Sequence, residues 1–95
     1  MRIISKKALV DFYKKHSNAE MPLLAWYNII SKNDFGSFIE LRKCFPSVDK
    51  VKELYVFNIG GNNFRLIAAI HFNMQLLFVR EILTHKDYDK GVWKK

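Results

Sequence analysis

The sequence predicts an α+β fold in which helices pack on one face of an antiparallel sheet. Apolar residues recur at helical spacing in the first half of the chain, and from Leu54 onward they alternate with a period of two. A short apolar pair, Ile3 and Ile4, precedes the first helical segment. The expected sheet therefore combines an N-terminal strand with a C-terminal three-stranded meander, and two or three helices cover one of its faces. A chain of 95 residues fits one domain, spanning residues 1–95.

Two long segments carry the helical spacing. The first is expected to start after Ser5 as its cap, with a core-facing stripe of Leu9, Phe12, Tyr13 and His16. The second is expected to start with Asn18 as its cap, to tolerate Pro22 in its first turn and to end near residues 33–34.

Two shorter segments complete the helical part. Residues 38–45 predict a short helix stopped by Pro46, followed by a loop over residues 47–52. After the last strand, Thr84 is expected to cap a closing helical turn, with Asp87 giving a weak capping box.

Three strands are expected over residues 54–59, 64–72 and 75–83. Gly and Asn residues between the first two supply the positive φ angles that a hairpin turn needs, and Asn73-Met74 is the second turn. One face of the last two strands is almost entirely apolar, so it is expected to take the helices; it carries Phe64, Leu66, Ala68, Ile70, Phe72, Leu77 and Val79.

The opposite, open face is expected to gather polar residues. With two-residue turns in both hairpins, Asn58 faces Arg65 and Ile67 faces Arg80, and directly paired side chains share a face. Asn58, Arg65 and Arg80 then form one group, which a one-residue slip in register would break. His85 and Tyr88 leave the end of the same sheet.

These residues suit metal-independent cleavage of RNA by its own 2′-hydroxyl. That reaction needs a base, an acid and positive charge at the phosphorane. Arg65 and Arg80 can hold phosphate oxygens, His85 can serve in either proton role, and Tyr88 can orient or stack a nucleotide. The alternative is structural, with each arginine covering an open sheet face and pairing with a nearby acid.

The charge balance also favours a polyanionic partner. Sixteen Lys and Arg against nine Asp and Glu give a net charge of +7. Lys6 and Lys7 lie off the apolar stripe of the first helix, where they form either a solvated face or a surface that tracks phosphates.

The remaining sequence features argue against a metal site, a secreted protein and a membrane protein. The three histidines and the single Cys44 do not have the spacing of a metal site, so no metal and no small-molecule cofactor are expected. A lone cysteine fits a reducing cytosol. The N-terminus lacks the apolar core of a signal peptide, and no apolar run approaches the ~20 residues of a membrane helix. We therefore expect a cytoplasmic protein without a membrane partner.

The sequence resembles the HigB-type toxins of bacterial type II toxin–antitoxin systems, within the RelE-like superfamily of messenger-RNA interferases. The resemblance runs over nearly the whole chain and is strongest in Val56-Phe57-Asn58-Ile59-Gly60-Gly61-Asn62, Phe64-Arg65-Leu66, Arg80 and Thr84-His85-Lys86-Asp87-Tyr88-Asp89. It implies a RelE-like fold and a ribosome-dependent endoribonuclease held inactive by a cognate helix-turn-helix antitoxin.

The family's strand arginines and C-terminal His and Tyr match Arg65, Arg80, His85 and Tyr88. RelE-like relatives also use lysines on the sheet, whereas this chain has none between Lys52 and Lys86, which leaves His85 as the candidate base. Candidate RNA-binding residues are Asn58, Asn62, Lys86, Lys6 and Lys7.

Two other functions stay open at this point. One is a non-catalytic basic protein that binds RNA or the ribosome, and the other is a gyrase-poisoning toxin of the same superfamily. Codon preference and the division of acid and base roles are not fixed by the sequence.

Overall fold

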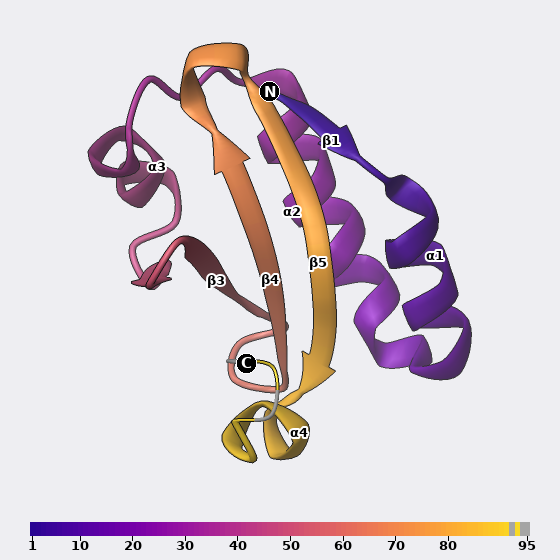
Figure 1. Ribbon diagram of the computed structural model, residues 1–95. Helices are drawn as coiled ribbons and strands as arrows, with labels where there is room; N and C mark the ends of the chain where they lie inside the picture. The colour runs from indigo at the N-terminus through magenta and orange to yellow at the C-terminus, as the bar shows by residue number, and fades with distance from the viewer. Residues whose placement is uncertain (92, 94–95) are drawn as a thin grey trace.

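The computed structural model describes residues 1–91 and 93. Over these residues the chain forms a five-stranded sheet in the order β1-β5-β4-β3-β2, with α1, α2 and α3 against one face (Figure 1). The strands are β1 (Arg2–Ile4), β2 (Asp49–Val51), β3 (Leu54–Ile59), β4 (Phe64–His71) and β5 (Leu76–Thr84). The α-helices are α1 (Lys6–Lys15), α2 (Glu20–Lys32), α3 (Phe38–Cys44) and α4 (His85–Asp89). This is the predicted α+β class.

The sheet is mixed, and in this respect the predicted antiparallel sheet was wrong. β1 runs parallel to β5, with Arg2 opposite Leu76 and Ile4 opposite Phe78. The apolar pair at the start of the chain indicates a strand but says nothing of its direction. The other pairings are antiparallel, as expected of a meander; they join β2 with β3, β3 with β4 and β4 with β5.

β2 occupies part of the predicted loop over residues 47–52. Asp49 pairs with Val56 and Val51 with Leu54, so the two strands form a tight hairpin. Its turn uses Lys52 at a φ of 57°. Because turns with positive φ usually contain Gly or Asn, this hairpin carries no recognisable turn residue in the sequence.

The helix starts differ from the predicted caps. Ser5 does precede α1, but its side chain makes no capping hydrogen bond. Asn18 lies inside a 3₁₀ turn (Ser17–Ala19), so α2 starts at Glu20, and Pro22 stands in its first turn as predicted. Ala19, in the same turn, is fully buried, so contact with the core fixes this helix start in place of a polar cap. None of the helices in the described part is long and apolar enough to cross a membrane.

The core lies between the helices and the predicted apolar face of the sheet. In Figure 1, α2 passes behind β5, and α1 lies beside β5. Trp26 of α2 meets Phe57 of β3 edge to face, with ring centroids 5.4 Å apart. The largest fully buried side chains from both layers are Phe57, Leu9, Leu23, Ile30, Leu41, Leu66 and Leu77. The prediction of this face is confirmed.

A register shift interrupts the pairing of β4 with β5. Ala68 pairs with Val79 as predicted, but Ile67 pairs with Glu81, so Arg80 is an additional residue in β5. Between the shift and the start of β4, Arg65 pairs with Leu83, and Ile82 packs against the core. The predicted pairing of Ile67 with Arg80 was therefore wrong. A β-bulge of this kind changes which face the following side chains take.

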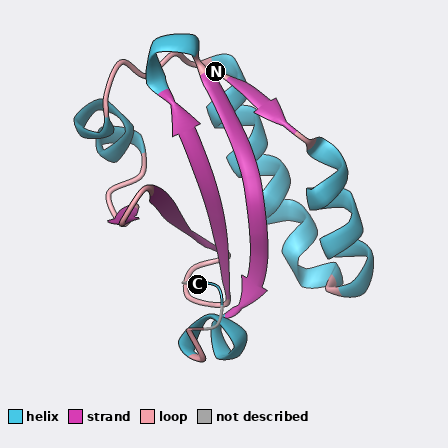
Figure 2. Ribbon diagram, viewed as in Figure 1, coloured by secondary structure: helices cyan, strands magenta, loops and turns pink. Residues whose placement is uncertain are grey.

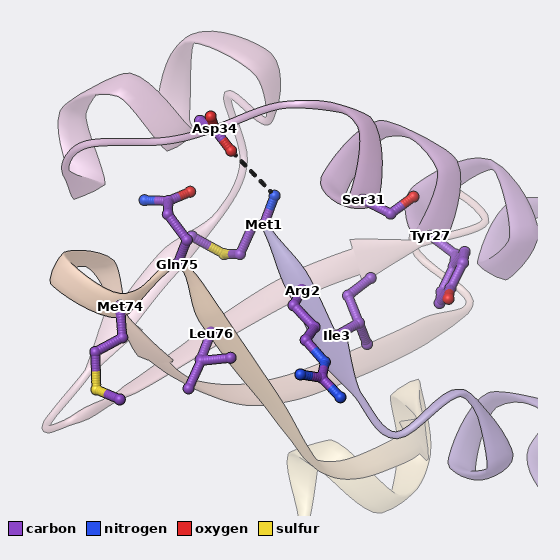
Figure 3. A pocket seen from close by; sticks show the side chains of 9 residues that line it. All are labelled: Met1, Arg2, Ile3, Tyr27, Ser31, Asp34, Met74, Gln75 and Leu76. Atoms are coloured by element: carbon purple, nitrogen blue, oxygen red, sulfur yellow. Dashed lines mark ion pairs between the residues drawn. The ribbon is translucent and has the colours of Figure 1, made fainter.

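The N-terminal amino group ties β1 to the end of α2. It donates hydrogen bonds to the carbonyl oxygens of Ile30 at 3.2 Å and Asn33 at 2.5 Å. It also forms an ion pair with Asp34 at 3.5 Å, which Figure 3 shows as a dashed line. A positive charge is favourable there, because the C-terminus of a helix carries partial negative charge. This interaction fixes the edge of the sheet against the helical layer.

Gln75 forms hydrogen bonds in the same part of the molecule. It has a φ of 53°, and its amide group bonds both the N–H and the C=O of Phe35, at 3.1 and 2.6 Å, as well as the C=O of Phe72 at 2.8 Å. The backbone carbonyl of Gln75 accepts a hydrogen bond from the backbone N–H of Arg2 at 2.8 Å. The loop between α2 and α3 is thereby joined to the β4–β5 turn.

We expect Gln75→Ala to lower the free energy of unfolding by about 1–3 kcal/mol, because it removes three side-chain hydrogen bonds and leaves partly buried backbone groups unpaired. Asn73→Ala, in the same turn but exposed and without these bonds, is the matched control and is expected to change stability by less than about 0.5 kcal/mol. Urea unfolding of both variants measures the difference; equal stabilities would contradict the role of Gln75.

Candidate functional site

Arg65 is the one buried charged side chain among the described residues, with 8% of its surface exposed. Its guanidinium donates to the side-chain oxygen of Asn62 at 2.7 Å and to the carbonyl of Phe64 at 3.1 Å. Within the described residues no carboxylate forms an ion pair with it. A buried cation without a counter-ion is costly, so its retention suggests a ligand that supplies the negative charge.

Tyr88 covers this cation. The guanidinium carbon of Arg65 lies 5.4 Å from the centre of the Tyr88 ring, which is cation–π distance. α4 holds Tyr88 there, because β5 leads directly into α4 at the end of the sheet (Figure 2). Thr84 accepts from the N–H of Asp87 at 3.1 Å, which confirms the predicted cap, and the N–H of His85 donates to the carbonyl of Asn63 at 2.9 Å.

The environment of Tyr88 keeps its hydroxyl protonated. Burial raises the pKa of Tyr88 above its ordinary value of 10.0, and the negative charges of Asp49 and Asp89 raise it further, while Arg65 acts in the opposite direction. The neighbouring cation thus fails to make Tyr88 a base. A phenol that keeps its proton at neutral pH can donate it, so the site offers an acid at this position.

His85 lies one helical turn before Asp89. Its Nε2 atom is 3.3 Å from a carboxylate oxygen of Asp89, and the imidazole is about half exposed, at 48%. A carboxylate at Nε2 favours a proton on that nitrogen and leaves Nδ1 with a free lone pair. The arrangement provides a proton acceptor on the same short helix as Tyr88.

The structure brings together Asn62, Arg65 and Tyr88, with Asn58 opposite Arg65 in the β3–β4 ladder. Lys86 is exposed on α4, beside His85.

The structure places the other predicted residues elsewhere. Arg80 lines a separate hollow of about 290 Å³ with α1, which includes Asp11 and Lys15. Lys6 lies 5.0 Å from the ring of Tyr27 on α2, in the helical layer, and Lys7 pairs with Asp11 at 3.2 Å. The predicted grouping of Arg80 with Arg65 depended on a register that the bulge removes.

A second cavity adjoins the site. It measures about 270 Å³ and is lined by Glu81, Leu83, Asp87, Lys90 and Trp93. Trp93 also stacks on Tyr88, with centroids 5.0 Å apart and planes 18° apart, and its indole N–H donates to the Tyr88 carbonyl at 3.2 Å. Sequence reasoning missed this cavity, because its walls depend on the shifted register and on the return of the chain after α4. Among the described residues no three His, Cys, Asp or Glu side chains are placed to hold a metal ion.

The chain is also similar to a known family of proteins. Residues 19–91 match the family model of HigB_toxin, described as the RelE-like toxic component of a toxin-antitoxin system. This chain belongs to the HigB toxin family. It is 41% identical over 92 residues to the mRNA interferase toxin HigB of Escherichia coli (strain K12), an alignment that covers 94% of this chain and 88% of that protein. It is 39% identical over 93 residues to the mRNA interferase HigB of Escherichia coli O6:H1, covering 95% and 90%.

Membership of the HigB family confirms the resemblance. A HigB toxin is one component of a pair, so an antitoxin is its partner. The family match also spans the strands, the turns and α4 that build the site around Arg65 and Tyr88.

The raised pKa of Tyr88 in this HigB protein predicts a loss of stability in alkali. The folded state favours the protonated phenol, whereas in the unfolded chain Tyr88 ionises near pH 10. This contribution is therefore complete below about pH 10 and falls as the pH rises toward the folded-state pKa.

Tyr88→Phe should lose less stability than the wild-type protein as the pH rises from about 9.5 to about 11 in urea unfolding, because the loss begins near the pKa of about 10 of the unfolded chain. Tyr13→Phe, which removes a hydroxyl from α1, is the control and should follow the wild-type curve. Parallel curves for all three proteins would contradict the assignment.

Proposed function

We propose that this HigB-family toxin cleaves messenger RNA at the ribosome, through attack of the RNA's own 2′-hydroxyl on the adjacent phosphate. The observation that carries the proposal is the buried cation of Arg65, which has no carboxylate counter-ion among the described residues and lies beneath a protonated Tyr88. The relatives named mRNA interferase favour RNA cleavage over simple RNA binding or gyrase poisoning.

The proposed reaction divides its roles among three side chains. Nδ1 of His85 takes the proton from the 2′-hydroxyl, the 2′-oxygen bonds to phosphorus, and the bond from phosphorus to the 5′-oxygen breaks. Tyr88 gives its proton to that leaving oxygen. Arg65 supplies positive charge to the phosphorane from a site of low dielectric, where a charge acts more strongly than in water.

The remaining predicted residues serve binding. Asn58, Asn62 and Lys86 lie around the site and contact the RNA near the cut. Lys6, Lys7 and Arg80, in the helical layer and beside α1, attract the phosphates of longer RNA or of the ribosome. The proposed roles are all taken by side chains of the protein, and in the part of the chain that the structure describes no three His, Cys, Asp or Glu side chains are placed to hold a metal.

The toxin acts in the cytoplasm, and its cognate antitoxin is a small helix-turn-helix protein encoded beside it. Binding of such an antitoxin keeps the toxin from its RNA until the antitoxin is removed. Expression of the toxin alone is then expected to stop bacterial growth, and co-expression of the antitoxin restores it.

Induction of the toxin should produce new ends in ribosome-associated messenger RNA within minutes. The 5′ fragment should carry a 2′,3′-cyclic phosphate or the 3′-phosphate derived from it, detected by its resistance to ligation until phosphatase treatment. His85→Ala should slow cutting by roughly 10²–10⁴. A 3′-hydroxyl end would show attack by water and overturn the mechanism, and growth arrest without new RNA ends would favour the non-catalytic binder.

Arg65→Met should reduce cutting by about 10²–10³, since it removes the charge that stabilises the phosphorane. Its free energy of unfolding should be unchanged or higher, because an unpaired buried charge is replaced by an apolar side chain.

Arg80→Met is the matched control, since it removes the same charge from an exposed strand position, and its loss should stay below about tenfold. Primer extension measures cutting and urea unfolding measures stability. Equal loss of cutting in both variants would place Arg80 in the chemistry as well.

A further inference from the structure

The cavity beside the site is the right size for one flat ring system. It measures about 270 Å³ and lies between β5, which contributes Glu81 and Leu83, and the segment from α4 onward, which contributes Asp87, Lys90 and Trp93. Pockets for drug-sized ligands span roughly 300–1,000 Å³, so this one suits a smaller group. The indole of Trp93 offers a flat wall on which a base can stack.

Two residues that line the cavity are direct neighbours of the residues of the proposed phosphate site. Leu83, which lines it, is the direct β-ladder partner of Arg65. Directly paired residues share a face, with their Cβ atoms about 4.5–5.5 Å apart. Trp93, which also lines it, stacks on Tyr88. The lining of the cavity is therefore joined to Arg65 through Leu83 and to Tyr88 through Trp93.

The charges in the cavity exclude a phosphate and select a base edge. Glu81 and Asp87 place carboxylates there, which repel phosphate oxygens but accept hydrogen bonds from amino groups. Lys90 pairs with Asp87 at 3.6 Å and offsets part of this charge, whereas Glu81 has no ion pair among the described residues. Adenine, cytosine and guanine each carry an exocyclic amino group that can donate to a carboxylate. Uracil has no amino group, and the carbonyl oxygens on both sides of its single ring N–H are repelled by a carboxylate that accepts from it.

We propose that this cavity, lined by Glu81, Leu83, Asp87, Lys90 and Trp93, is a nucleobase subsite that admits an amino-bearing base and rejects uracil at one position of the cut sequence. The subsite rests on the proposed function, because it reads a base of the RNA whose phosphate lies at Arg65. Glu81 and Asp87 are the residues that determine this specificity.

The test maps the cut sites across the transcriptome after induction of the full-length toxin, and compares base frequencies at each position around the cut. The wild-type protein should show uracil depleted at one position. Glu81→Gln and Asp87→Asn should each raise uracil there several-fold, because an amide can also donate to a carbonyl oxygen. Glu53→Gln, an exposed carboxylate in the β2–β3 turn, removes the same charge and should leave the wild-type depletion in place.

Trp93→Ala tests the stacking wall. It should lower cutting by roughly 5- to 150-fold, while Trp93→Phe keeps most of the activity, because loss of one stacked base contact has an effect of that order. Circular dichroism and thermal unfolding of each variant establish that the change lies in the site and not in the fold.

The outcomes separate the subsite from the function itself. If wild-type toxin produces no new RNA ends, the proposed function fails and the subsite falls with it. If RNA is cut without uracil depletion at any position, or if depletion persists unchanged in both Glu81→Gln and Asp87→Asn, RNA cleavage stands and the subsite is overturned.

Discussion

The pairing of β4 with β5, with its one-residue shift, is the constraint on which the rest of the molecule depends. Above the shift, direct pairing of Ala68 with Val79 aligns the apolar faces that α1 and α2 cover. Below it, the extra residue turns Ile82 toward the core and places Leu83 opposite Arg65. The same strand then delivers α4 to the end of the sheet. One irregular position thus joins the packing of the core to the geometry of the site.

Arg65 shows why the site stands on the sheet face away from the helices. A guanidinium within the main core would need a carboxylate or a full set of acceptors to offset its desolvation. On the other face it has Asn62, the carbonyl of Phe64 and the ring of Tyr88, which orient it without neutralising it. Val56 and Ile67, on the same face, are nearly fully buried outside the main core cluster. They form a small apolar floor that lowers the local dielectric around the cation.

The spacing of apolar residues was enough to predict the α-helices, the three strands of the meander, the face that takes the helices and the pairing of Asn58 with Arg65. Those features follow from local periodicity, which is present in any single sequence. The bulge at Arg80 was not predictable, since no Gly or other irregular residue marks it and the apolar pattern tolerates either register. The β2 hairpin was missed for a similar reason, because its turn uses Lys52 at positive φ.

The candidate site was predicted in part: the features that depend on local sequence were found, and those that depend on the register of β4 and β5 were not. His85 and Tyr88 follow a strand end, and a capped helix after that strand brings Tyr88 back over the sheet regardless of small register changes. Arg80 depends on the register itself, so its predicted place beside Arg65 failed with the shift. The raised pKa of Tyr88 was also beyond sequence reasoning, because its first cause is burial in the folded site and its second is the charge of Asp49, which lies in the strand that was taken for a loop.

The distribution of charge over this end of the sheet gives a nucleotide one preferred orientation. The protein carries a net charge of +7, which draws RNA to it without distinguishing phosphate from base. At the site, positive and negative charges lie in two different places. The cation of Arg65 lies beneath Tyr88, and the carboxylates of Glu81 and Asp87 lie around the neighbouring cavity. Phosphate is attracted to the first and repelled by the second, whereas a base that carries an amino group is attracted to the second. In the proposed binding mode, a nucleotide has its phosphate at Arg65 and its base against Trp93, and it lies beside α4, which carries His85 and Tyr88.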